Sequence, residues 1–216
     1  MYNNNWLTRL NRKFGRYAIH NLMLYIVIGQ AIVYAFDFVL SPTGINISGI
    51  LYFYLPAIKA GQVWRLVSFA LIPPGSWLIF AVLFLYFSWL MGSALENEWG
   101  AVKFNLFYLT GIVGTVLGGL ITQYASNTYI HMSMFLAFAL IYPEFEILLF
   151  FILPVKVKYL AMVYLVFLAF SLLTASWGGR VAILISVLNL FLFFGPQILE
   201  RIHLWRRRMQ WKSKFK

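Results

Sequence analysis

The sequence predicts an all-α membrane protein, a bundle of six transmembrane helices with a long interfacial loop between the first two. Of its 216 residues, 62% are hydrophobic and 11% are charged, whereas a soluble domain carries about 25% charged residues. Such a surplus of apolar side chains cannot be buried in one globular core, so lipid must solvate much of the surface. The chain contains no cysteine, which excludes disulfides and thiolate metal sites.

Six apolar segments give the predicted spans in chain order. The first, 17–40, is followed by the turn formers SPTGINISG and by an aromatic stretch that Pro56, Lys59 and Arg65 interrupt. We expect this stretch to be an interfacial loop with short helices, half immersed in the outer leaflet, because lipid does not tolerate an irregular backbone. The other five spans are predicted at 77–95, 104–122, 128–143, 159–174 and 181–194.

The fourth span is too short to cross the bilayer unaided. It ends before Glu144 and Glu146, which are costly at membrane depth. Its length is therefore about 14 residues, or roughly 21 Å, against a hydrocarbon core of about 30 Å. Such a span must be shielded by its neighbours, so we expect it at the centre of the bundle. The apolar run 147–154 is expected to lie along the cytoplasmic interface.

The distribution of lysine and arginine predicts the orientation in the membrane. Six spans put both termini on one side, and of the 17 basic residues only Lys59, Arg65 and Arg180 fall on the other side. The positive-inside rule then places both termini in the cytoplasm, in a multi-pass protein of the plasma (inner) membrane. The expected segments are a basic N-terminus at 1–16, a membrane domain at 17–196 and a basic amphipathic tail at 197–216.

Regularly spaced residues mark the junction between the second and third spans. Glu96 there is either a solvated turn residue or a hydrogen-bonding residue that caps a helix end. The interfacial loop contains the adjacent pair Trp64 and Arg65, and the third span contains Gly114 and Gly118, which favour close helix crossing. At the junction, residues four apart would share one helical face, and they are Gly92, Glu96, Gly100, Phe104 and Tyr108.

This arrangement resembles the rhomboid intramembrane serine proteases. The resemblance rests on the Trp-Arg pair, the Gly-xxx-Glu-xxx-Gly motif and the short fourth span, and it covers about 51–194. It implies a six-helix bundle whose active site opens to the outer face. There, a serine in a Gly-x-Ser-Gly motif on span four is activated by a histidine on span six. A histidine and an asparagine on span two stabilise the oxyanion.

The resemblance also locates the positions of the base and of the oxyanion donors. On span six, the small pair of the family is matched by Ala182 and Ser186, so the histidine position falls at Gly179. The oxyanion positions fall at Phe80 and Phe84, neither of which donates a hydrogen bond. The general base and the oxyanion donors are therefore missing.

The position of the nucleophile is ambiguous. Matching HMSM to the serine motif gives Ser133, whereas counting back from Pro143 gives a position near Thr128. His131 is badly placed to activate Ser133, because residues two apart on a helix point about 200° away from each other. We expect His131 at the aqueous interface and Ser133 bonded to its own helical turn.

These replacements favour a pseudoprotease that binds the transmembrane segments of client proteins. One alternative is an active serine endopeptidase that cleaves transmembrane substrates, with Ser133 as nucleophile and an unidentified base. Ser133 and His131 are the fallback catalytic candidates. A small membrane transporter is the second alternative. Asn189 is expected to form an interhelical hydrogen bond. The expected partners are the lipid bilayer and client helices rather than nucleic acid, and no cofactor or metal is expected from three scattered histidines.

Overall fold

The chain is mostly helical in the computed structural model, and five of the helices in the described part are long and apolar enough to cross a membrane. The protein is therefore an integral, multi-pass membrane protein embedded in lipid. The described residues are 15–73, 77–123, 125–149, 153–181, 183–185 and 187–194.

Each predicted span coincides with a helix, although five rather than six of these helices reach the length of a full span. The shorter helix is α8 (Thr128–Ile141), and its 14 residues match the predicted fourth span. The tail at 197–216, like most of the N-terminus at 1–16, lies outside the described residues. The long helices are α2 (Leu22–Leu40), α6 (Leu78–Trp99), α7 (Ala101–Thr122), α9 (Val157–Thr174) and the helix Trp177–Phe194, called helix 177–194 below.

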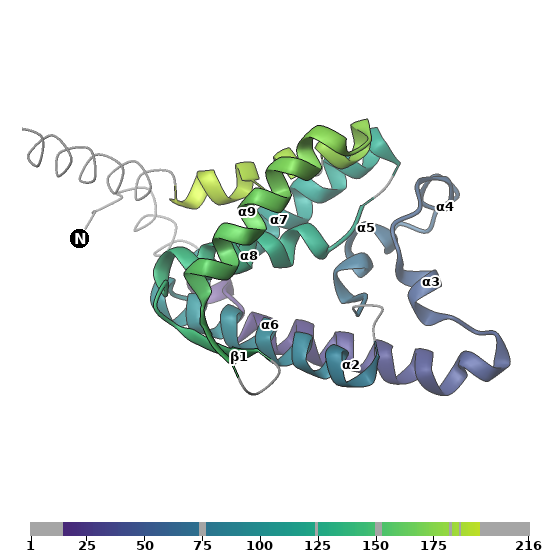
Figure 1. Cartoon of the computed structure of the whole chain (residues 1–216). Coiled ribbons are helices and arrows are strands. Elements are labelled where there is room, and N and C mark those ends of the chain that lie inside the picture. Colours follow the sequence, from purple (N-terminus) through teal and green to yellow (C-terminus); the bar gives the residue numbers. More distant parts are fainter. Residues whose placement is uncertain are drawn as a thin grey trace, which may run out of the picture.

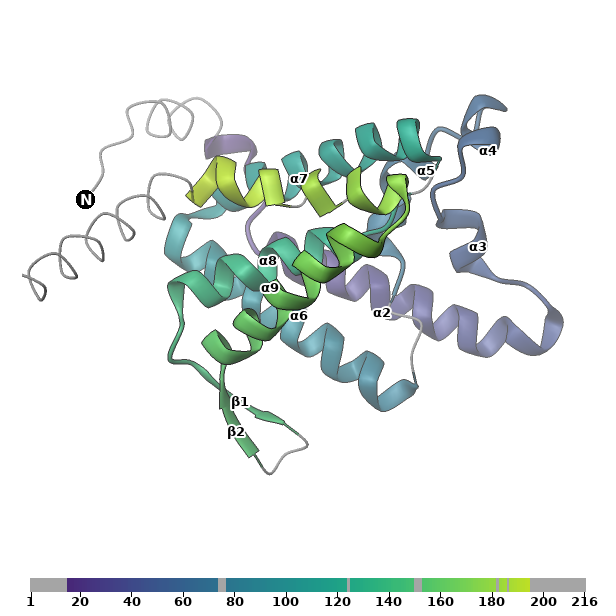
Figure 2. The ribbon, with the colours of Figure 1, turned by 45° about the horizontal axis from the view of Figure 1, so that its top comes forward.

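Helix α8 lies at the centre of the bundle, as predicted. It packs against α6, α7 and α9, and eight of its 14 residues are buried. Helix α9 is mostly exposed, because of its 18 residues Val157 and Ala161 are the buried ones. Figure 2 shows α9 on the near side of α8. The short span is thus shielded from lipid by its neighbours, whereas the fifth span is mostly exposed.

The loop between α2 and α6 contains short helices, as predicted. It leaves the bundle at the end where α7 and α9 also finish, and Figure 1 shows it as a separate lobe beside them. Two of its aromatic side chains, Phe53 and Phe69, are buried and meet edge to face with ring centroids 6.4 Å apart. The elements of the loop are η2 (Ser41–Thr43), α3 (Ile47–Leu51), α4 (Leu55–Lys59), α5 (Arg65–Ser68) and η3 (Phe69–Leu71).

The segment after α8 corrects the all-α prediction. Residues Glu146–Leu149 (β1) and Leu153–Lys156 (β2) form an antiparallel hairpin, which projects from the bundle in Figure 2. Short apolar runs are compatible with a strand as well as with a helix. Pro143 lies between α8 and β1 and favours a break, because proline cannot supply the hydrogen bond that a continuing helix needs.

Candidate functional site

The four-residue repeat at the α6–α7 junction holds the start of α2 against the end of α6. Glu96 is buried, and its carboxylate accepts hydrogen bonds from the backbone N–H groups of Asn21 at 2.6 Å and Leu22 at 3.2 Å. These are N–H groups at the start of α2, which have no partner within the helix. Of the two predicted roles, the structure therefore supports that of a helix cap.

The glycines of this repeat allow the close approach. A Cβ atom on Gly92 would lie 2.4 Å from the Cγ of Met23, so α2 and α6 could not pack this closely with a larger residue there. Gly100 has a φ of +82° and joins α6 to α7 by a single-residue turn, a conformation that favours glycine. Phe104 and Tyr108 follow on the buried side of α7. The repeat thus has a structural role.

Glycines of α7 also contact helix 177–194. Cβ atoms on Gly114 and Gly118 would lie 2.7 and 2.6 Å from side-chain atoms of Ile185, which confirms that these glycines permit close crossing. Asn189 is buried one turn further on, where its Oδ1 accepts from the hydroxyl of Thr110 at 2.8 Å. The interhelical hydrogen bond predicted for Asn189 is thereby confirmed. The small pair predicted on span six, Ala182 and Ser186, lies outside the described residues.

The Trp-Arg pair has two different environments. The guanidinium of Arg65 is buried and donates to the carbonyl oxygens of Gly49 at 3.1 Å and Tyr52 at 2.8 Å. It also lies 5.4 Å from the ring centroid of Tyr52. Trp64, by contrast, is half exposed. Arg65 therefore holds α3 and α5 together inside the loop, while Trp64 faces outward.

One of the two implied oxyanion positions lies against α8. The ring of Phe84 meets the ring of His131 edge to face, with centroids 5.0 Å apart. Phe80, one turn away on α6, is exposed. His131 itself is only 4% exposed, so the prediction that it lies at the aqueous interface is wrong. Helices α2 and α6 cover it.

The buried partner of His131 is Gln30 of α2, which sequence reasoning missed. The amide nitrogen of Gln30 donates to the carbonyl of Ala70 at 2.9 Å and lies 3.2 Å from the Nε2 of His131. A carbonyl oxygen can only accept, so the atom of Gln30 that faces Ala70 must be the amide nitrogen. One hydrogen of this amide goes to Ala70 and the other to the Nε2 of His131, which therefore accepts. The proton of the neutral imidazole is then on Nδ1, which is buried without a partner among the described residues, as is the Oε1 of Gln30.

The other candidate catalytic residues are not brought together. Ser133 is buried and its hydroxyl donates to the carbonyl of Ile130 at 2.9 Å, which confirms the predicted bond to its own turn. The hydroxyl of Thr128 pairs with that of Ser126 at 2.8 Å, at an exposed site. A Cβ on Gly179 would have its nearest neighbours in Ala175 and Ser176, beyond the end of α9. No described contact joins these positions to one another.

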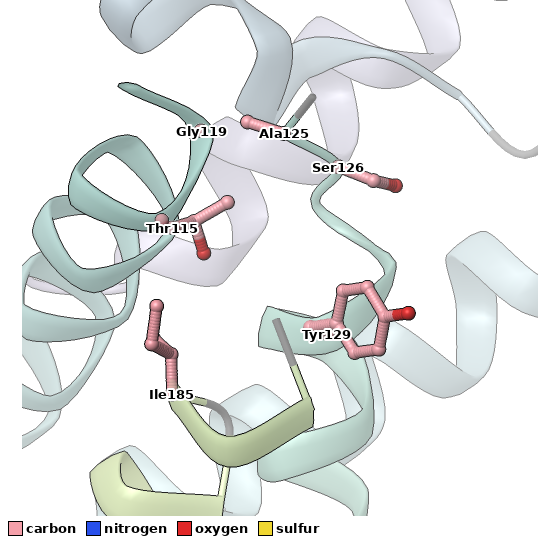
Figure 3. A pocket seen from close by; sticks show the side chains of 7 residues that line it. Thr115, Gly119, Ala125, Ser126, Tyr129 and Ile185 are labelled. Atoms are coloured by element: carbon pink, nitrogen blue, oxygen red, sulfur yellow. The ribbon is translucent and has the colours of Figure 1, made fainter. Parts of the chain in front are cut away.

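A small cavity lies between α7, the start of α8 and helix 177–194. Its volume of about 10 Å³ is that of a single water molecule at most. Figure 3 shows Thr115 and Ile185 facing each other across it, while the hydroxyls of Ser126 and Tyr129 point away. The cavity is therefore too small for a substrate or a cofactor.

Two larger apolar grooves open on the surface of the bundle. The first, called the α6 groove, has a volume of about 670 Å³ and lies between α6 and β1. Its walls are six residues of α6 between Ile79 and Leu90, including Phe80, and the hairpin residues 145–148. The second groove, of about 410 Å³, lies between α8, α9 and helix 177–194. Both grooves face the surroundings of the bundle, which are lipid.

The charged residues of this region gather at the base of the hairpin. The carboxylate of Glu144 pairs with Lys158 at 2.6 Å and with Lys156 at 2.9 Å. Hydrogen bonds from these two lysines lower the pKa of Glu144 to about 2. Among the described residues, no group of three or more histidine, aspartate or glutamate side chains could hold a metal ion.

Comparison with known proteins adds no relative: no family model, no curated protein and no solved structure matches this chain.

Proposed function

We propose that this protein is a rhomboid-like pseudoprotease that binds the transmembrane segments of client proteins from the side. The observation that carries the proposal is the α6 groove, an open apolar site between α6 and the hairpin. The protein would then have the rhomboid-like scaffold that the sequence resemblance implies, without the hydrolytic activity.

The surroundings of α8 support the loss of catalysis. A serine nucleophile needs a base within about 2.6–3.2 Å. The hydroxyl of Ser133 is instead bonded to a backbone carbonyl, and His131 is engaged by Gln30 and Phe84. Phe84 also offers no donor to a developing oxyanion. An active endopeptidase with Ser133 as nucleophile is therefore the weaker candidate.

The size of the α6 groove supports a helix as the bound group. Two turns of a helix about 10 Å wide occupy roughly 850 Å³, which compares with about 670 Å³ for the groove. A client helix would therefore lie partly in the groove and partly in lipid. The second groove is about half this helical volume and fits lipid chains better.

The orientation that we propose puts both termini and the charged base of the hairpin on the cytoplasmic side, and the strands extend from there beside α6. The interfacial loop then lies at the outer face, because it leaves the bundle at the opposite end from the hairpin (Figure 1). In this orientation, the α6 wall of the groove runs from Ile79, near the outer face, to Leu90, and Glu146 lies on the hairpin wall. A carboxylate among these apolar residues would attract a lysine or arginine of a client segment.

Labelling with a fluorophosphonate probe in native membranes tests the loss of catalysis. We expect no labelling of the wild-type protein under conditions in which an active rhomboid protease is labelled. Labelling that disappears in Ser133→Ala would show an activated serine and overturn the pseudoprotease half of the proposal.

Disulfide crosslinking in lipid nanodiscs tests client binding. Because the chain has no cysteine, Leu83→Cys places one thiol in the α6 groove, and Val113→Cys places one on an exposed part of α7 as a matched control. The probe is a single-span polyleucine helix with one central cysteine and lysines at its cytoplasmic end. We expect crosslinking to Leu83→Cys several times faster than to Val113→Cys. Equal rates would mean random collision in the bilayer and would refute the binding site.

A further inference from the structure

The hairpin has two outer edges, and their backbone groups can be assigned from its register. The N–H of Val157 donates to the carbonyl of Phe145 at 2.8 Å, so these two residues form a hydrogen-bonded pair. In antiparallel strands such pairs alternate with non-bonded ones. Ile147 and Val155 are then the next bonded pair. It follows that Glu146 and Leu148 turn their N–H and carbonyl groups away from β2.

The opposite edge of the hairpin is blocked. Pro154 lies directly across from Leu148, in a non-bonded pair, and its nitrogen is therefore on the outer side of β2. A proline there has no N–H to offer and prevents another strand from pairing. The edge of β1 carries no such block, so the two edges of the hairpin are not equivalent.

The open edge of β1 borders the α6 groove. Residues 145–148 all line this groove, whereas none of the described residues of β2 does. Backbone groups that face an apolar space without a partner are costly, and in lipid the cost of each is several kcal/mol. An extended peptide in the groove would remove this cost, because each of its alternate residues pairs with the strand edge.

We propose that β1 binds an extended stretch of the client polypeptide as an added strand in the α6 groove. The inference rests on the proposed function and deepens it, since it specifies the conformation and the chemistry of the bound segment. The segment is a stretch within a client span where the helix gives way to an extended chain, at the depth of the first half of α6. Its backbone pairs with Glu146 and Leu148, and its apolar side chains lie against Phe80, Leu83 and Phe87 of α6.

The charge of the groove selects a basic residue in this segment. Glu144 is neutralised by two lysines, whereas Glu146 belongs to neither ion pair found among the described residues. Lys156 lies across the hairpin from Glu146 but bonds to Glu144. A lysine or arginine that follows the apolar stretch of the client would supply the direct partner of Glu146 and fix the register.

Backbone methylation of a synthetic peptide tests for strand pairing. The probe is a fluorescent peptide of eight apolar residues with one lysine, and its partition into empty nanodiscs is subtracted. Strand pairing uses every second N–H of the peptide. Two methylated peptides are compared, one with N-methyl groups at residues 2, 4 and 6 and one with them at residues 3, 5 and 7. We expect one of the two to bind about tenfold more weakly than the unmodified peptide, and the other to bind about as well. Binding of a helical peptide would be weakened alike by both sets of methyl groups, and this outcome would overturn the inference.

A proline substitution tests the same edge from the side of the protein. Leu148→Pro removes the outward N–H at the position across from Pro154, so the internal hydrogen bonds of the hairpin remain. We expect about a tenfold loss of peptide affinity, whereas Leu148→Ala keeps the N–H and most of the affinity. Unchanged binding by Leu148→Pro would contradict strand addition.

Substitution of Glu146 tests the role of its charge. Glu146→Gln should weaken binding of the peptide that contains lysine and leave binding of an analogue with norleucine in its place unchanged. Glu144→Gln is the control.

The crosslinking experiment separates the two proposals. In one outcome, the polyleucine helix crosslinks to Leu83→Cys, while peptide binding is unaffected by methylation and by Leu148→Pro. Clients then bind as helices, and the strand inference is wrong. If neither the polyleucine helix nor the peptide binds, the proposed function and the strand inference both fail. Binding of lipid alone would appear as equal partition into empty and protein-containing nanodiscs. Pairing of two β1 edges would appear as dimers that Leu148→Pro dissociates, and either result would overturn the inference.

Discussion

Removal of the Glu96 carboxylate should destabilise the whole bundle, because this one group caps α2 from the end of α6. The carboxylate accepts from Asn21 and Leu22, and Glu96 is only 8% exposed. Glu96→Ala would leave both N–H groups without their acceptor. The first helix would then lose its cap and its only described polar link to the α6–α7 junction.

The magnitude follows from the two hydrogen bonds. A hydrogen bond to a charged group contributes about 1.5–3 kcal/mol, and a negative charge at a helix N-terminus adds about 0.3–1 kcal/mol. Burial of the carboxylate offsets part of this sum. We therefore expect Glu96→Ala to lower the free energy of unfolding by about 3 kcal/mol. Glu96→Gln keeps one acceptor oxygen, so about half of that loss is expected.

Steric trapping in bicelles would measure the free energy of unfolding directly. The matched control is Glu98→Gln, which changes an exposed carboxylate two residues along the same helix and should cost less than about 0.5 kcal/mol. If Glu96→Gln and Glu98→Gln were equally stable, the carboxylate of Glu96 would contribute nothing as a cap. The structural account of the Gly-xxx-Glu-xxx-Gly motif would then be refuted.

Three further predictions concern packing, an interhelical bond and pH. Gly92→Ala should cost about 1–3 kcal/mol in the same assay, because its Cβ would collide with Met23. Asn189→Leu and Thr110→Val should show a coupling of about 0.6 kcal/mol in a double-mutant cycle, the average for such bonds in membranes. The ion pairs lower the pKa of Glu144 from 4.5 to about 2, so their stabilisation is complete above pH 4.5 and is lost as the pH falls to 2. Thermal melts of the Glu144→Gln protein should lack this acid-dependent loss.

Each of these predictions has a control in the same chain. A Cβ on Gly49 would make ordinary contacts of 3.6 Å, so Gly49→Ala should be close to neutral where Gly92→Ala is not. A zero coupling between the changes at positions 110 and 189 would contradict the interhelical bond. An acid transition that persists unchanged in Glu144→Gln would assign it to another group.

The positions of the helices were predictable because length and apolarity decide them. A run of about 20 apolar residues must be satisfied by its own backbone hydrogen bonds in lipid. The predicted ends were less accurate: the third span begins at Ala101 rather than at 104, because Gly100 makes the turn alone. The hairpin was missed because the run 147–154 is too short for its periodicity to separate a strand from a helix.

The candidate site was predictable only where the relevant contacts are local. The bond of Ser133 to Ile130 spans three residues and follows from helix geometry. The environment of His131 depends on Gln30, which is 101 residues earlier in the chain, so no local pattern reveals its burial. Glu96 is intermediate: its spacing indicated a helix cap as one of two roles, but only the fold shows that it caps α2.

Four polar side chains satisfy backbone groups at helix ends and loops, and the edge of the hairpin can be compared with them. Arg65, Asn127 and Arg180 each donate to two backbone carbonyls beside a helix end or a loop, and Glu96 accepts from two N–H groups. In a low-dielectric surrounding, such pairing avoids the full cost of an unsatisfied backbone group. Within the described residues, the outer edge of β1 has no comparable partner, although it borders an apolar groove. Since side chains satisfy the backbone groups at these four places, the fold would gain most from a bound strand at the unpaired edge of β1.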